Sequence, residues 1–298
     1  MEFQRARSSA SDGPSALVLR VPYEEGAYWR KGTREGPDAI VNALKRLRPF
    51  SLRRNRALPL PVQCYLAPML DIDPYDRSVA FQKIEAGISG ILARHCVPVT
   101  LGGDHSLTYP VVRSLAAYHG PRTFAILHLD AHSDTFPATG GYDYHHGAVF
   151  RKIVEDGLVA PEDMHQLGLR GLVPSGGMDF ASTHGYHLVS AGDVRATGCR
   201  LDALEIDSGK PYYVSIDIDA VDPAFAPGTG TPVPGGLTSA ELLDLIQQIT
   251  CLPLVGLDLV EVAPIYDPAG ITVLLAAHVI MEILIASPFV TAEDAQLT

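Results

Sequence analysis

The chain has 298 residues, of which 23 are Lys or Arg and 34 are Asp or Glu, so its formal net charge is −11 at pH 7. This acidic balance, without any block of basic residues, argues against non-specific binding to nucleic acid. Its four cysteines lack C-x-x-C spacing, so we expect reduced thiols rather than a disulfide framework.

The two ends of the chain give no sign of a membrane protein. Residues 1–15 are rich in Ser, Arg and Gly and lack the apolar segment of a secretion signal, so we expect a disordered tail followed by a single domain over 16–298. The most hydrophobic segment, 271–286, contains His278 and Glu282 and is short for a bilayer span. We therefore expect a cytoplasmic protein with a buried C-terminal helix.

Apolar segments rich in β-branched residues alternate with helical patterns along the chain. The expected strands are 16–21, 98–101, 124–129, 165–169, 187–189, 212–218 and 254–259. The expected helices are 37–47, 78–95, 107–119, 147–156, 239–249 and 270–286. Continuously apolar strands are buried on both faces, and alternating strands and helices indicate a parallel sheet. We predict a three-layer α/β/α fold around a mostly parallel sheet.

Three short clusters of acidic and histidine residues follow expected strands. The first is Gly102-Gly103-Asp104-His105-Ser106, and the other two place charged residues at every second position. Side chains at every second position of an extended segment project to the same side. Ligands of open α/β sheets bind at the carboxyl ends of strands, so the clusters should converge on one crevice. The candidate metal ligands are His105, Asp130, His132, Asp134, Asp217 and Asp219.

These six side chains have the composition of a two-metal site. Carboxylates aimed at one point repel each other unless cations neutralise them. Six ligands are too many for tetrahedral zinc, and oxygen ligands with two imidazoles suit Mn²⁺. Two ions about 3.5–4 Å apart could share bridging carboxylates. A single D-x-D or D-x-H could equally be a turn or a cap, but their shared position after buried strands favours the metal site.

Three further polar residues near the clusters are not counted as ligands. His128 shares strand parity with Asp130, and we interpret it as either a support of the ligands or simply a hydrogen-bonded core residue. We interpret Asp104 and Asp222 as carboxylates that either fix loops or support the metal ligands.

The clusters and their flanks resemble the signatures of the ureohydrolase superfamily, which comprises arginases, agmatinases and their relatives. The segments that carry the resemblance are 102–106, 128–135, 215–223, 226–238, 256–264 and 30–40. The similarity covers about 16–285. It implies an arginase-like fold, all six ligands and two divalent ions, with Mn²⁺ favoured and Ni²⁺ also compatible. It further implies a homo-oligomer, a trimer or hexamer, although a hetero-oligomer with a related subunit is an alternative.

The resemblance also implies hydrolysis of a guanidino carbon–nitrogen bond with release of urea. It assigns to Asp134 the orientation of the attacking hydroxide, in addition to metal binding. It assigns to Glu261 the binding of the substrate guanidinium, a planar cation that independently requires a bidentate acceptor. It makes His146 a proton shuttle to the leaving amine, for which imidazole is suited, with His145 as the alternative.

Substrate choice depends on the loops. True arginases carry an asparagine two positions after the residue equivalent to Asp134, whereas this chain has Phe136, as agmatinase-like members have an aromatic residue there. Asp143 could meet a distal amine or could equally face solvent. We therefore predict hydrolysis of agmatine to putrescine and urea. The alternatives are guanidinobutyrate or guanidinopropionate, formiminoglutamate, and small or alkylated guanidines and biguanides.

Two other classes of function compete with this interpretation. A two-metal phosphoester hydrolase would place Arg or Lys near the ions to neutralise phosphate, and the clusters contain neither. A non-catalytic subunit of a hetero-oligomer would be expected to have lost ligands, whereas this chain retains all six together with Glu261.

Overall fold

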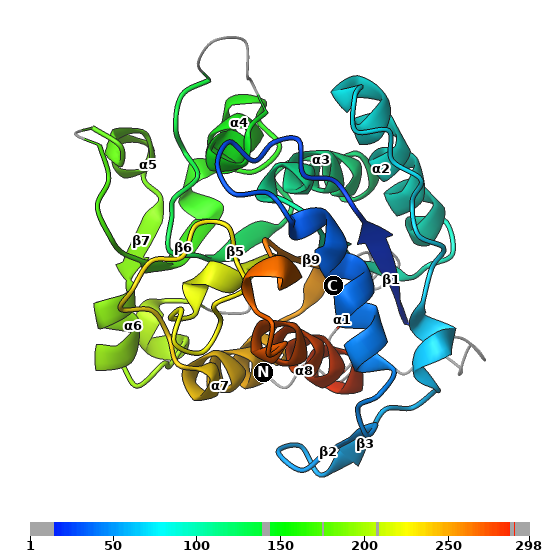
Figure 1. Ribbon diagram of the computed structural model, residues 1–298. Helices are drawn as coiled ribbons and strands as arrows, with labels where there is room; N and C mark the ends of the chain where they lie inside the picture. The colour runs from blue at the N-terminus through cyan, green and yellow to red at the C-terminus, as the bar shows by residue number, and fades with distance from the viewer. Residues whose placement is uncertain (1–14, 139–143, 175, 207–208, 287–288, 290–298) are drawn as a thin grey trace.

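The computed structural model describes residues 15–138, 144–174, 176–206, 209–286 and 289. A seven-stranded sheet with the order β1-β4-β9-β8-β5-β6-β7 forms its centre (Figure 1). The strands are β1 Ala16–Val21, β4 Val97–Gly102, β5 Ala125–Leu129, β6 Met164–Leu169, β7 His187–Ser190, β8 Tyr212–Asp217 and β9 Leu254–Val260. Every neighbouring pair is parallel, and each predicted strand is present with its ends shifted by at most one residue.

Helices cover both faces of the sheet, which confirms the predicted three-layer architecture (Figure 1). One layer consists of α2 Arg77–Leu92, α3 Thr108–His119, α4 Val149–Glu155 and α5 Asp179–His184. The other consists of α1 Gly36–Leu44, α6 Ala191–Ala196, α7 Ser239–Ile249 and α8 Ile271–Ala286. The six predicted helices are present with ends shifted by at most three residues, while α5, α6 and the hairpin of β2 Phe50–Ser51 and β3 Arg56–Ala57 were not predicted.

Local chemistry explains where the helices begin and which are buried. Helix α7 begins with a capping box, in which the Thr238 hydroxyl accepts from the Glu241 N–H and the Glu241 carboxylate accepts from the Thr238 N–H. Helix α8 is apolar around most of its circumference and packs against α1 and α7. Within the described residues, no helix is both long and apolar enough to cross a membrane.

The strand order brings together the four strands that precede functional residues. Strands β4, β9, β8 and β5 are consecutive neighbours in the sheet. Their ends are level, because Leu101 pairs with Leu259, Leu259 with Ile216, and Ile216 with Leu129. The residues that follow this row therefore emerge at one edge, where open α/β sheets bind their ligands.

A glycine allows the turn after β4 to approach two other segments closely. The Gly103 N–H donates to the Val21 carbonyl at 3.0 Å, and its carbonyl accepts from the Glu261 N–H at 2.8 Å. A Cβ at this position would lie 1.8 Å from the Tyr23 carbonyl oxygen. Any other residue would have to push the backbone segments apart, so glycine is required for this approach.

We expect Gly103→Ala to lower the free energy of unfolding of the metal-free protein by about 1–3 kcal/mol, because the added methyl overpacks backbone atoms. The matched control is Gly90→Ala in α2, where a Cβ meets nothing within 4 Å. This control should be neutral or stabilising by up to about 1 kcal/mol through helix propensity. Urea denaturation of both variants measures the difference, and equal unfolding midpoints would contradict the close packing at Gly103.

Candidate metal centre

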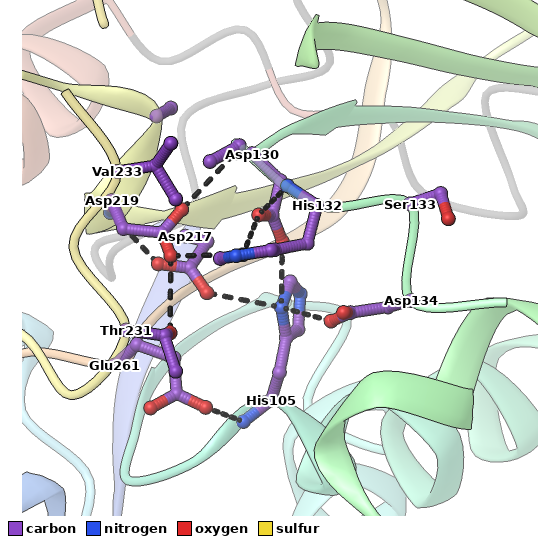
Figure 2. A network of polar contacts seen from close by, with 12 residues as sticks. His105, Asp130, His132, Ser133, Asp134, Asp217, Asp219, Thr231, Val233 and Glu261 are labelled. Carbon is purple, nitrogen blue, oxygen red and sulfur yellow. Dashed lines mark hydrogen bonds and ion pairs between the residues drawn. The ribbon is translucent and has the colours of Figure 1, made fainter. Parts of the chain in front are cut away.

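The six candidate ligands meet at the edge formed by β4, β8 and β5 (Figure 2). His105 Nδ1 lies 3.3 Å from Asp130 Oδ2 and 3.2 Å from Asp134 Oδ2. It also lies 3.4 Å from Asp217 Oδ2. One group of donor atoms therefore faces a common point from three separate segments of the chain.

A second group of donor atoms lies next to the first. His132 Nδ1 lies 3.3 Å from Asp130 Oδ1 and 3.1 Å from Asp219 Oδ2. Asp130 therefore turns one carboxylate oxygen to each group, the arrangement expected of a bridging ligand. Asp217 Oδ1 accepts from the backbone N–H of Asp219 at 2.8 Å, which fixes the Asp217 carboxylate against the turn that carries Asp219.

The electrostatics of the cluster are compatible with cation binding. Burial and the charges of Asp219 and Asp130 raise the pKa of Asp217 well above its usual value. Burial and the charge of Asp130 raise the pKa of Asp219 to about 6. Burial alone would lower the pKa of His105, but the carboxylates around it raise that pKa well above its usual value. Protons relieve the repulsion in the metal-free protein, and divalent ions would do so more completely.

The hydrogen bonding of His105 and the types of donor atom are also compatible with a bound metal. His105 Nδ1 is buried and makes no hydrogen bond of good geometry within the described part of the chain. A buried polar atom without a hydrogen-bond partner is costly unless another ligand satisfies it. The donor set of carboxylates and two imidazoles suits Mn²⁺ and related ions. The cluster is thus compatible with metal binding.

His128 is close enough to be mistaken for a ligand, but its hydrogen bonds indicate otherwise. Its Nε2 lies 2.8 Å from Asp130 Oδ2, and its Nδ1 lies 3.0 Å from the Gln166 amide nitrogen. The same amide nitrogen donates to the Ser133 carbonyl at 2.7 Å, so it is a donor and His128 Nδ1 must accept. His128 therefore donates through Nε2 to Asp130 and supports that ligand, one of the two predicted roles.

Asp104 and Asp222 fix loops, which is the first of the two predicted alternatives. Asp104 Oδ2 accepts from the N–H groups of Gly26 at 2.6 Å and Ala27 at 3.0 Å, and thereby fastens the loop 24–28 beside the cluster. Asp222 Oδ2 accepts from the Gly235 N–H at 2.6 Å on the loop that follows β8.

Glu261 and His146 contact each other beside the cluster. His146 Nδ1 lies 3.0 Å from Glu261 Oε1, and the same oxygen accepts from the His105 N–H at 2.9 Å (Figure 2 shows the second contact). Burial alone would lower the pKa of His146, but Glu261 and nearby carboxylates raise it to about 9. Asp134 and Glu261 both have φ in the left-handed region, 50° and 61°, a strained conformation typical of functional positions.

No hydrogen bond or ion pair with the metal ligands or Glu261 is seen for the other residues considered for substrate binding, among the described part of the chain. His145 lies next to His146 but packs near Gly147, so His146 is the histidine that contacts Glu261. Phe136 lies beside the same loop and lines a shallow cleft with Tyr144 and Arg151. Asp143 lies outside the described residues.

Several residues of the site were not predicted. Tyr28 places its ring 4.8 Å from that of His146 and is 76% exposed, so it covers this histidine from the solvent side. Arg170 donates to the carbonyls of Asp219 at 2.6 Å and Val233 at 2.7 Å. Thr231 donates to Asp219 Oδ2 at 3.2 Å. Thr231 lies in a segment that carries the family resemblance, but no local pattern marks any of the three as part of the site, since each depends on which loops lie together.

Comparison with known proteins agrees with this geometry. The model of the Arginase family matches residues 14–286. Proclavaminate amidinohydrolase of Streptomyces clavuligerus is 40% identical over 91% of this chain and 88% of the relative, and its solved structure superposes with a TM-score of 0.86 over 93% and 92% of the two chains. The mitochondrial guanidino acid hydrolase of Homo sapiens is 37% identical (95% and 81%), and the mitochondrial agmatinase of Gallus gallus is 35% identical (94% and 83%).

The fold and the site thus define a hydrolase of the ureohydrolase class, which acts on guanidino groups. The chain belongs to the Arginase family, and the resemblance inferred from its motifs is confirmed.

The raised carboxylate pKa values predict a pH dependence. The pKa of Asp219 is about 6 in the folded protein against 3.8 normally, so protonation stabilises the metal-free fold at low pH, and this stability is lost as the pH rises from about 4 through 6. The contribution is at most roughly 3 kcal/mol. Because protons compete with metal ions, the increase in Tm on adding Mn²⁺ should be larger at pH 7 than at pH 5.

Thermal unfolding with and without excess Mn²⁺ across this range measures the effect. Asp219→Asn, which removes the titrating group, should reduce the pH dependence. A Mn²⁺-induced increase in Tm that does not change with pH would contradict the competition between protons and metal.

Proposed function

We propose that this chain hydrolyses the guanidino group of a small cationic substrate and releases urea, with two divalent ions, Mn²⁺ in preference to Ni²⁺, held by the six ligands. The observation that carries the proposal is the contact between Glu261 and His146 beside two groups of metal ligands that share Asp130. A metal-storage site would need neither residue.

The ions, when bound, would make water nucleophilic at neutral pH. Asp134 reaches the cluster from the strained turn after β5, where its carboxylate would accept a hydrogen bond from the attacking water. Glu261 Oε1 is already occupied by His105 N–H and His146. Its second oxygen would accept an N–H of the substrate guanidinium, so that one carboxylate orients both the substrate and the histidine. The cation would therefore meet one free oxygen of Glu261 rather than the two expected from the sequence.

His146 would supply the proton that the leaving amine requires. Its pKa of about 9 keeps the imidazole protonated in the metal-free protein, and bound cations would lower that pKa toward neutrality. Its Nε2 is buried without a hydrogen bond among the described residues, so this atom is free to donate to a leaving nitrogen.

Agmatine is the substrate that we propose, with putrescine and urea as products. Phe136 next to the loop of His146 replaces the carboxylate-binding amide that an α-amino acid would need. A guanidino acid is the second candidate, since the relatives reported at 40% and 37% identity are named for proclavaminate and a guanidino acid. Assembly into trimers or hexamers, with or without a related subunit, and a cytoplasmic location remain predictions.

Urea release from matched substrates tests the function. With Mn²⁺ and, separately, Ni²⁺, we expect the highest kcat/KM for agmatine, a lower value for guanidinobutyrate, which ends in a carboxylate, and the lowest for arginine. The opposite order of the first two would replace the proposed substrate but keep the reaction. Turnover of a generic phosphoester, with no urea from any guanidino compound, would contradict the function itself.

A second variant separates guanidinium binding from metal binding. Glu261→Gln should lower kcat/KM by roughly a hundredfold or more, because an amide cannot pair with the cation as a carboxylate does. The surface change Glu35→Gln, at an exposed residue, is the matched control. Elemental analysis should find two ions per chain in both. Full activity in Glu261→Gln would refute its role.

A further inference from the structure

Behind His105, on the side away from the cluster, a buried network of hydroxyl groups ends in a carboxylate. His105 Nε2 lies 2.8 Å from Ser215 Oγ, which donates to Asp258 Oδ1 at 2.7 Å. Asp258 Oδ2 accepts from Thr108 Oγ1 and from Tyr213 OH, both at 2.5 Å. All five residues are completely buried, and none of the four behind His105 takes part in the proposed reaction.

If Asp258 is a carboxylate, it sets the direction of each hydrogen bond in this network. A carboxylate has no hydrogen to donate, so Asp258 must receive the hydroxyl hydrogens of its neighbours. Burial and the charge of Asp258 raise the pKa of Tyr213 well above its usual value, so the phenol keeps its hydrogen. Ser215 has a single hydrogen, which is committed to Asp258. Its oxygen can therefore only accept from His105, and the imidazole must carry a hydrogen on Nε2.

That hydrogen determines what His105 presents to the cluster. In a neutral imidazole with hydrogen on Nε2, Nδ1 carries the lone pair. Nδ1 is the atom that lies 3.3 Å from Asp130 and 3.2 Å from Asp134. The other tautomer would point an N–H at the cations and would leave the Ser215 oxygen without its donor.

We propose that Ser215 and Asp258 are positioning residues, which hold His105 in the tautomer and ring orientation that bind the metal. The inference rests on the proposed metal-dependent function. Hydrogen-bonded partners behind a metal-binding histidine fix its orientation and raise its basicity. Here the carboxylate acts through an intervening serine rather than directly.

The position of Asp258 makes a purely structural explanation insufficient. It lies in β9 between β4 and β8, paired with Thr100 on one side and Ser215 on the other. A carboxylate in the centre of a sheet is costly unless its charge is compensated. An apolar residue would satisfy the packing at lower cost. The Asp258 carboxylate reaches the metal ligand His105 through the single hydroxyl of Ser215.

The test compares two hydroxyls that donate to the same carboxylate. Ser215→Ala removes the link to His105, whereas Tyr213→Phe removes a hydroxyl that does not touch the ligand. Mn²⁺ binding to the metal-free proteins is measured by calorimetry, and their stability by urea denaturation. We expect Ser215→Ala to weaken one of two Mn²⁺ sites by roughly 10–100-fold. Tyr213→Phe should leave both Mn²⁺ affinities within about threefold of those of the unmodified protein. It should still lower the urea unfolding midpoint, because it removes one buried hydrogen bond.

Several outcomes would overturn the inference. Unchanged Mn²⁺ affinity in Ser215→Ala would do so, and so would equal losses of affinity in both variants, since these would indicate a merely structural role. If Ser215→Ala does not fold, Ser215→Cys retains the size with a weaker hydrogen bond and should show an intermediate affinity. Failure of the unmodified protein to bind any divalent ion would instead overturn the proposed function, which distinguishes the two.

Discussion

Buried carboxylates repel one another at one edge of the sheet, and the rest of the structure must compensate for this repulsion. Asp130, Asp217 and Asp219 are almost completely buried and face one another together with Asp134. Without compensation such a group would destabilise the fold, as the raised pKa values of Asp217 and Asp219 indicate. The two histidines supply neutral donors when cations are present and protons when they are absent. Cation binding and the stability of this edge are therefore coupled.

Much of the remaining fold holds this unfavourable arrangement in place. Level strand ends in the four central strands set the spacing of the ligands, and loops are then fastened to one another rather than to solvent. Asp104 ties the loop 24–28 to the turn after β4, and Arg170 binds the carbonyls around Asp219. The left-handed backbone at Asp134 and Glu261 persists because several segments determine it together.

Long and regular elements were predicted from the sequence, whereas short ones were missed. The seven strands and six longer helices carry enough apolar residues to show a period, whereas α5 and α6, with six residues each, are too short for one. The same holds within the site. Asp130, His132 and Asp134 were predicted because alternate positions after a strand are a local pattern. Asp258 was not, because it meets Ser215, 43 residues away, only through the pairing of β8 and β9.

The sequence by itself determined the α/β class, the six candidate ligands and the family, because strand periodicity and short motifs are properties of neighbouring residues. Only the tertiary structure decided that β4, β9, β8 and β5 are adjacent, that Asp130 faces both groups of donors, and that His146 rather than His145 contacts Glu261. It also placed Ser215 and Asp258 behind His105. The physical reason is that strand order and side-chain partners follow from burying both faces of the sheet at once, a condition that involves the whole chain.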